Sequence, residues 1–164
     1  MKRTRRRPRQ GPEREMLQGH LDYLRNTLIW KLEGLDREGA SLHLVPSLTT
    51  LLGIVKHSTD TQEWWFRVIM NGERIPLTYY TEDDPDADWR IEPHDTVTSV
   101  IAAYRGACDR ANEAVTLYSL DDFTRGRGYK RSLRWVYLNM IDELARHCGH
   151  ADILRELTDG ATGD

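Results

Sequence analysis

Apolar residues recur at intervals of three and four along four segments of the chain, and this spacing constrains the fold more than any other sequence feature. In the first segment the stripe consists of Leu17, Leu21, Leu24, Leu28 and Leu32. Such a stripe is typical of an amphipathic α-helix that buries one face. Pro12 suits the beginning of this helix and Gly34 suits its end.

Three further segments show the same spacing, and each follows a residue whose side chain can cap the first backbone N–H groups of a helix. These helices are expected over about 47–70, 95–118 and 132–154, with Ser47, Asp95 and Ser132 as N-caps. Four helices without an alternating strand pattern predict an all-α four-helix bundle. Two of the crossover loops are long, so an up-down-up-down order is not assured.

The longest connection, roughly residues 72–94, is rich in Asp, Pro and aromatic residues. A connection of this length without structure is uncommon in a compact domain unless it is functional or packs through its own side chains. Tyr79, Tyr80 and Trp89 therefore suggest a loop that lies across the bundle. With Trp64 and Trp65, they are also candidates for the wall of an apolar pocket, although ordinary packing explains most such residues.

The N-terminus differs from the rest of the chain in charge. Its first nine residues, MKRTRRRPR, hold six basic residues and no acid, which leaves 17 basic against 26 acidic residues elsewhere, a net charge of −9. We expect residues 1–11 to form a basic disordered tail and residues 12–164 to form one bundle domain. An acidic body argues against a nucleic-acid-binding domain, so weak RNA or DNA contact through the tail is the least favoured alternative.

Targeting and redox features favour the cytoplasm. No run of about 18 apolar residues is present, and the basic start runs into Gly11 and Pro12, so we expect neither a membrane span nor a signal peptide. Cys108 and Cys148 are too few for a disulfide framework and are expected to fill the core as free thiols.

Two polar residues lie in the middle of the apolar face of the fourth segment. At about 100° per residue, Glu143 and His147 lie one turn apart on the side that carries Met140, Leu144 and Ala151. A carboxylate in a core costs several kcal/mol unless it is paired or bound to a metal. The pair therefore indicates a buried hydrogen bond, a helix edge that reaches solvent, or two ligands of a metal site.

A third metal ligand would come from another helix, and His57 is the best candidate. It lies mid-helix in the second segment, and Gly53 one turn earlier is easier to explain if a close approach or a cavity is needed nearby. A lone helical histidine is more often structural, so that alternative stays open. His150 lies about 60° from His147 and is an alternative ligand, a partner of a ligand or a substrate contact.

Two stretches of the sequence resemble a known family. LLGIVKHSTDTQEWWF, and IDELARHCGHADILRE after SLRWV, are similar to the DinB-like (YfiT-like) bundle proteins. The similarity is closest to the actinobacterial branch that includes mycothiol-dependent S-transferases and, more distantly, mycothiol-dependent maleylpyruvate isomerase. EDDPDADW and ILRELTDGATGD extend the similarity, which runs from residue 13 to the C-terminus and leaves the basic tail unexplained.

The resemblance implies a four-helix bundle that holds a divalent metal, zinc or alternatively nickel, through His57, Glu143 and His147. Many relatives have a third histidine at the position of Glu143, whereas the mycothiol-using isomerase has a glutamate there. His150 occupies a position next to the site, and we assign it, with Trp64, to substrate binding. Family habit is also consistent with a homodimer.

The resemblance further implies mycothiol, a small sugar thiol, as co-substrate. A thiol activated as a metal-bound thiolate would be conjugated to a small electrophile, in detoxification or in a biosynthetic step. Two alternatives remain. One is a metal-dependent hydrolase of the same fold, in which bound water attacks the substrate. The other is a non-catalytic, stress-linked binding protein.

Overall fold

The chain folds into four long helices and one short helix in a computed structural model, which describes residues 6–126, 128 and 130–163. The elements are α1 (Glu13–Leu32), α2 (Arg37–Ala40), α3 (Leu51–Gln62), which continues as the π-helix η1 (Glu63–Met70), α4 (Val97–Ala114) and α5 (Leu133–Asp159). Within the described residues there is no strand, only an isolated bridge between Phe123 and Ser132. The predicted all-α bundle is confirmed.

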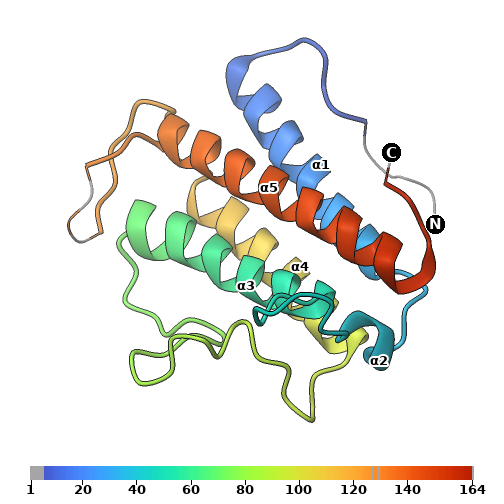
Figure 1. The fold of residues 1–164 in the computed structure, drawn as a ribbon. Helices are drawn as coiled ribbons and strands as arrows, with labels where there is room; N and C mark the ends of the chain where they lie inside the picture. Colours follow the sequence, from blue (N-terminus) through green and yellow to red (C-terminus); the bar gives the residue numbers. More distant parts are fainter. Residues whose placement is uncertain (1–5, 127, 129, 164) are drawn as a thin grey trace.

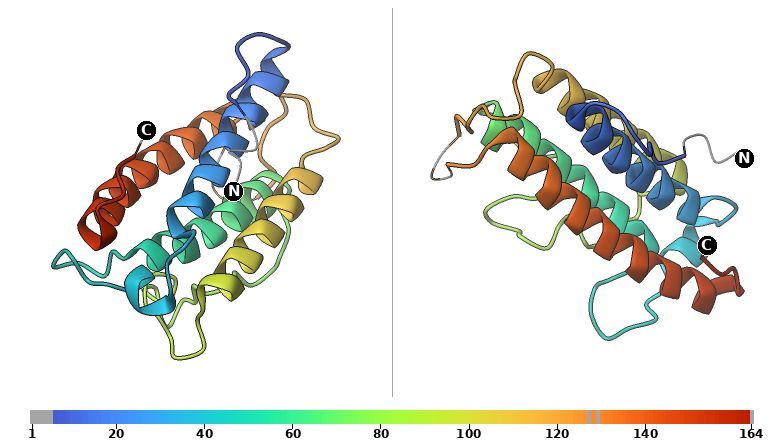
Figure 2. Two further views of the ribbon diagram at one scale, coloured as in Figure 1. Left: turned by 90° about the vertical axis from the view of Figure 1, so that its right-hand side faces the viewer. Right: turned by 90° about the horizontal axis from the view of Figure 1, so that it is seen from above.

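The helices do not alternate in direction along the chain. Helices α1 and α5 run in one direction, and α3 and α4 both run in the other (Figures 1 and 2). Helix α1 packs along α5, α3 packs along α4, and α5 also contacts α3. The connection after η1 therefore carries the chain back to the end of the bundle at which α3 begins.

The centre of the bundle is apolar, as the stripes predict. Fully buried side chains come from each of the four long helices and include Leu21, Leu28, Leu52, Ile54, Val100, Tyr104, Met140 and Leu144. Cys108 and Cys148 are buried and free, as expected. Among the helices that the structure describes, none is both long enough and apolar enough to span a membrane.

Two helices begin at other residues than the sequence predicts. Thr50 caps α3 and Thr96 caps α4, so the predictions of Ser47 and Asp95 as N-caps were wrong. Asp95 is instead buried, and its Oδ2 lies 2.7 Å from Nζ of Lys56. Because a buried ammonium group without a partner is strongly destabilising, this ion pair accounts for the position of Asp95. The capping residue predicted for α5 is correct.

Helix α3 widens into the π-helix instead of continuing regularly to Met70 as predicted. The N–H of Asn71 donates to the carbonyl oxygen of Phe66, five residues earlier, at 3.2 Å. Segments of this kind are rare and usually satisfy a local packing or functional demand. Here Glu63 is buried at the start of η1 and forms an ion pair with Arg110 of α4 at 2.6 Å.

The connection over 71–96 lies against α3, as its aromatic residues predict. Asp60 of α3 accepts hydrogen bonds from the backbone N–H groups of 78–80 at 2.6–3.2 Å. Lys56 donates to the carbonyl oxygen of Arg90 at 2.6 Å. These two buried side chains hold the connection on both sides of the position where it approaches His57.

The N-terminal segment contacts α1 over the part that is described. The guanidinium of Arg7 lies 4.4 Å from the ring centroid of Tyr23. Pro8 packs on α1 so closely that a Cβ at Gly19 would lie 2.6 Å from its Cγ. Residues 1–5 lie outside the described residues, so the division into a basic tail and a bundle domain stays a prediction.

Candidate metal centre

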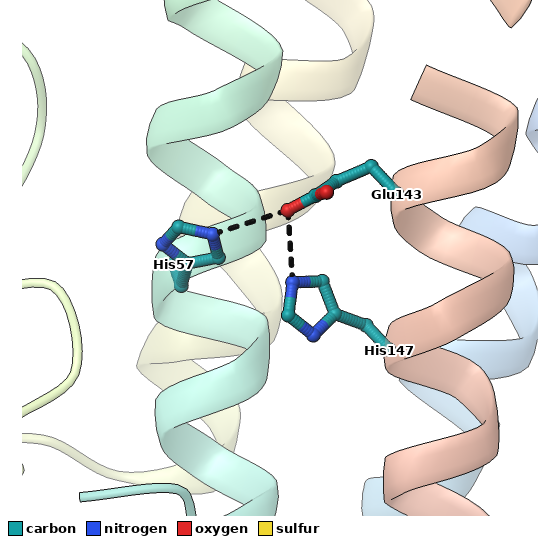
Figure 3. A group of neighbouring side chains, drawn as sticks. All are labelled: His57, Glu143 and His147. Atoms are coloured by element: carbon teal, nitrogen blue, oxygen red, sulfur yellow. Dashed lines mark hydrogen bonds and ion pairs between the residues drawn. The ribbon is translucent and has the colours of Figure 1, made fainter. Parts of the chain in front are cut away.

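The candidate site lies between α3 and α5. His57 comes from α3, and Glu143 and His147 come from successive turns of α5 (Figure 3). One ligand atom from each residue lies within 4.8 Å of the other two. The structure thus brings together the three residues that the sequence indicated, through the four-residue spacing in α5 and the packing of α5 against α3.

Glu143 joins the two histidines. Its Oε1 lies 3.0 Å from Nε2 of His147 and 3.4 Å from Nε2 of His57. Two ligands at a tetrahedral angle around an ion, each at ~2.1 Å, would lie about 3.4 Å apart. Because the Glu143 side chain is 30% exposed, the group also keeps one side accessible. Two imidazole nitrogens and one carboxylate oxygen are a donor set that suits a zinc-like cation, and the three atoms, which lie within 4.8 Å of one another, would draw closer around it.

Carboxylates dominate the electrostatics of the group. Burial alone would lower the pKa of His57. The hydrogen bonds and charges of Asp88 and Glu143 outweigh this effect, so the pKa rises from 6.5 to about 9. Hydrogen bonds from His147 and His57 hold the pKa of Glu143 well below its usual value. The site is therefore built around ionised carboxylates, whose charge a divalent cation would offset.

The family comparison covers almost the whole bundle. A family model described as Mycothiol-S-transferase matches residues 16–160, which span α3, η1, α4, α5 and most of α1. The chain belongs to the mycothiol-S-transferase family. No match was found among curated proteins, and none among solved structures.

Membership in the mycothiol-S-transferase family implies a small-molecule thiol as a partner. The thiols of the chain itself, Cys108 and Cys148, do not suit the role of a nucleophile. Burial raises the pKa of Cys108 to about 11 and that of Cys148 to about 12, so both are protonated near neutral pH. A nucleophilic sulfur would have to arrive with the substrate.

The site of this mycothiol-S-transferase family member includes a residue that the sequence analysis missed. Asp88, in the connection before α4, has Oδ2 2.7 Å from Nδ1 of His57. The neighbouring Trp89 stacks on the His57 ring, with centroids 4.3 Å apart. EDDPDADW contains five acidic residues, and only Asp88 among them is buried. The acidic stretch was a signal, but nothing in it distinguishes Asp88 from its neighbours.

Of the two residues assigned to substrate binding, His150 lies next to the group of three, and Trp64 lines a pocket that includes Asp88. His150 is exposed, and its ring centroid lies 5.7 Å from that of His147. Trp64 lines a pocket of about 290 Å³ together with Leu77, Tyr80 and Asp88. Neither side chain belongs to the converging ligand atoms, and their role in binding substrate stays a prediction.

Proposed function

We propose that the protein is a divalent-metal-dependent S-transferase that conjugates a mycothiol-type thiol to a small electrophile. The observation that carries the proposal is the convergence of His57, Glu143 and His147 in a chain of this family. Zinc fits this donor set best, and nickel is the alternative. The proposed setting is cytoplasmic detoxification, with a homodimer as a further proposal from family habit.

The chain's residues would hold the cation from two helices and leave one side open. When bound, the cation would lower the pKa of a thiol that reaches it, so that the thiol reacts as a thiolate near neutral pH. The sulfur then forms a bond to the electrophilic carbon, the leaving group departs with the bonding electrons, and the thiol proton passes to solvent. Among the three proposed ligands, Glu143 has the most exposed side chain, at 30%, against 20% for His57 and 10% for His147.

The pocket beside Asp88 is the proposed place for the electrophile. Trp64, Leu77 and Tyr80 give it apolar walls, which suit a small apolar organic molecule. His150, exposed next to His147, would contact the more polar thiol.

Elemental analysis of the purified, tag-free protein tests the metal proposal. We expect about one equivalent of a divalent metal in the wild type, since one group of three ligands converges, and none in His147→Ala. His94→Ala is the matched control, because His94 is exposed and lies outside the group; it should keep the metal. A wild type that holds no metal and does not take up added zinc would refute the proposal.

Turnover of a generic electrophile by the metal-loaded protein separates transfer from hydrolysis. Product that forms only when a low-molecular-weight thiol is added supports the S-transferase. Product that forms equally well without a thiol would instead favour the hydrolase of the same fold.

A further inference from the structure

His57 is held on two sides by adjacent residues of the connection before α4. Its Nδ1 lies 2.7 Å from Oδ2 of Asp88, and its ring stacks on Trp89 with an interplanar angle of 21°. Since an ionised carboxylate only accepts hydrogen bonds, Nδ1 carries the proton of this contact. The other ring nitrogen, Nε2, is directed toward Glu143 (Figure 3).

Asp88 is buried without full hydrogen bonding. The residue is 6% exposed, and its Oδ1 has no hydrogen-bond partner within the described part of the chain. A buried polar group left unsatisfied destabilises a fold by about 1–3 kcal/mol. The burial of Asp88 at this cost needs an explanation, and the contact of its Oδ2 with His57 supplies one.

The backbone around His57 allows the connection to come this close. Gly53 lies one turn before His57, and a Cβ there would be 2.8 Å from the carbonyl oxygen of Trp89. Any side chain at position 53 would therefore push residue 89 away from α3. Asp60, about one turn after His57, fixes the backbone of 78–80. The close approach of Asp88 and Trp89 to His57 is thus supported from both directions along α3.

The two histidines of the site differ in how they are held. Nδ1 of His147 is buried and finds no hydrogen-bond partner among the residues described. Its ring is oriented by the contact of Nε2 with Glu143 and by packing against the rings of His57 and Trp89. Only His57 has a carboxylate on the nitrogen that faces away from the site.

We infer that Asp88 is a positioning residue of the metal centre. It holds the proton on Nδ1 of His57, so that Nε2 is the ring nitrogen that can give up its proton and bind a cation on the side of Glu143 and His147. Trp89 fixes the plane of the ring. Hydrogen bonds of this kind orient metal-binding histidines and strengthen them as ligands. The inference rests on the proposed metal site and extends it to the connection before α4.

Zinc affinity of the full-length chain tests the inference, measured by competition with a chromogenic chelator. We expect Asp88→Ala to weaken zinc binding by about 10- to 100-fold. Asp88→Asn should weaken it less, because its amide oxygen still accepts from Nδ1. Asp83→Asn, exposed in the same connection, is the matched control and should match the wild type. Equal affinities of the wild type and Asp88→Ala would overturn the inference.

A second measurement does not depend on metal. In long-range ¹H–¹⁵N spectra of the metal-free protein, the Nδ1 proton of His57 should exchange slowly with water in the wild type. It should exchange rapidly in Asp88→Ala at unchanged helix content by circular dichroism. Rapid exchange in both proteins would overturn the role of Asp88. A wild type that binds no zinc would refute the proposed function. The exchange rate of the Nδ1 proton would still show whether Asp88 holds His57.

Discussion

At the scale of single residues, the buried thiol of Cys108 links stability to alkaline pH. Burial raises its pKa from 9.0 to about 11, so the folded protein keeps the proton that the unfolded chain releases first. The stabilisation is complete below the unfolded pKa and is lost as the pH rises toward 11.

We predict that the free energy of unfolding falls more steeply with pH in the wild type than in Cys108→Ala. Between pH 9 and pH 11 the difference should reach about 2–3 kcal/mol, from a shift of roughly two pKa units. Urea denaturation at several pH values measures it. Cys148, whose pKa burial also raises, contributes to both proteins alike, so equal slopes would contradict the prediction.

The sequence predicts which residues of the candidate site lie together wherever the geometry of a single helix decides it. Glu143 and His147 share a face of α5 because they are four residues apart in one helix. The contact of Asp88 with His57 spans 31 residues and depends on the path of an irregular connection. No local spacing rule selects Asp88 from five acidic residues in a row of eight, so this part of the site required the structure.

At the scale of elements, Gly53 decides how closely the connection packs on α3. Alanine is favoured over glycine inside a helix by about 1 kcal/mol, yet a Cβ at position 53 would lie 2.8 Å from the carbonyl oxygen of Trp89. We predict that Gly53→Ala lowers the free energy of unfolding, because the backbone of residue 89 must shift.

Gly149→Ala in α5 is the matched control. A Cβ there meets nothing within 4 Å, so this substitution should stabilise the protein by about 0.5–1 kcal/mol. Thermal or urea denaturation compares the two variants. If both substitutions changed the free energy of unfolding in the same direction, contact with residue 89 would not be what disfavours a side chain at position 53.

The anchoring of the connection by Asp60 yields another prediction. Both carboxylate oxygens accept backbone N–H groups, so Asp60→Asn would place an NH₂ group against at least one donor of 78–80. We expect a loss of about 1–3 kcal/mol in stability and faster proteolysis within 71–96. Asp109→Asn, exposed on α4, should change neither. Unaltered cleavage of the connection in Asp60→Asn would contradict the prediction.

The sequence predicted the long helices well because their apolar stripes repeat over many turns. The starts of α3 and α4 were predicted wrongly. For α4 the reason is that Asp95 suits an N-cap as well as Thr96 does, and only the buried partner of Asp95, Lys56, which lies 39 residues away, distinguishes the two. The sequence analysis also missed η1, since a change in backbone hydrogen bonding from α to π leaves no clear mark in the apolar spacing.

At the scale of the whole molecule, a buried arginine connects three helices. Arg25 of α1 donates to Gln62 of α3, to Asn112 of α4, and to Asp22 in its own helix. It is 3% exposed, and its removal would leave Oε1 of the fully buried Gln62 without the donor that it has in the wild type. We predict that Arg25→Ala lowers the free energy of unfolding by about 3–5 kcal/mol.

Chemical denaturation measures this loss against an exposed arginine. Arg146→Ala removes an ion pair with Asp142 on the surface of α5 and should change stability by less than about 0.5 kcal/mol. Arg25 lies outside the group of three ligands, so folded Arg25→Ala should keep whatever metal the wild type holds. A loss below about 1 kcal/mol would contradict the role of Arg25.

The parallel course of α3 and α4 has a consequence for the order of folding. The chain must travel back along the bundle between these helices, and Asp88 lies on this return path. Glu143 follows His57 by 86 residues, so the contacts at the site close long loops. Contacts of high sequence separation are entropically costly and tend to form late. A metal captured there would therefore report a late step of folding, the packing of α5 against α3, and not the formation of either helix alone.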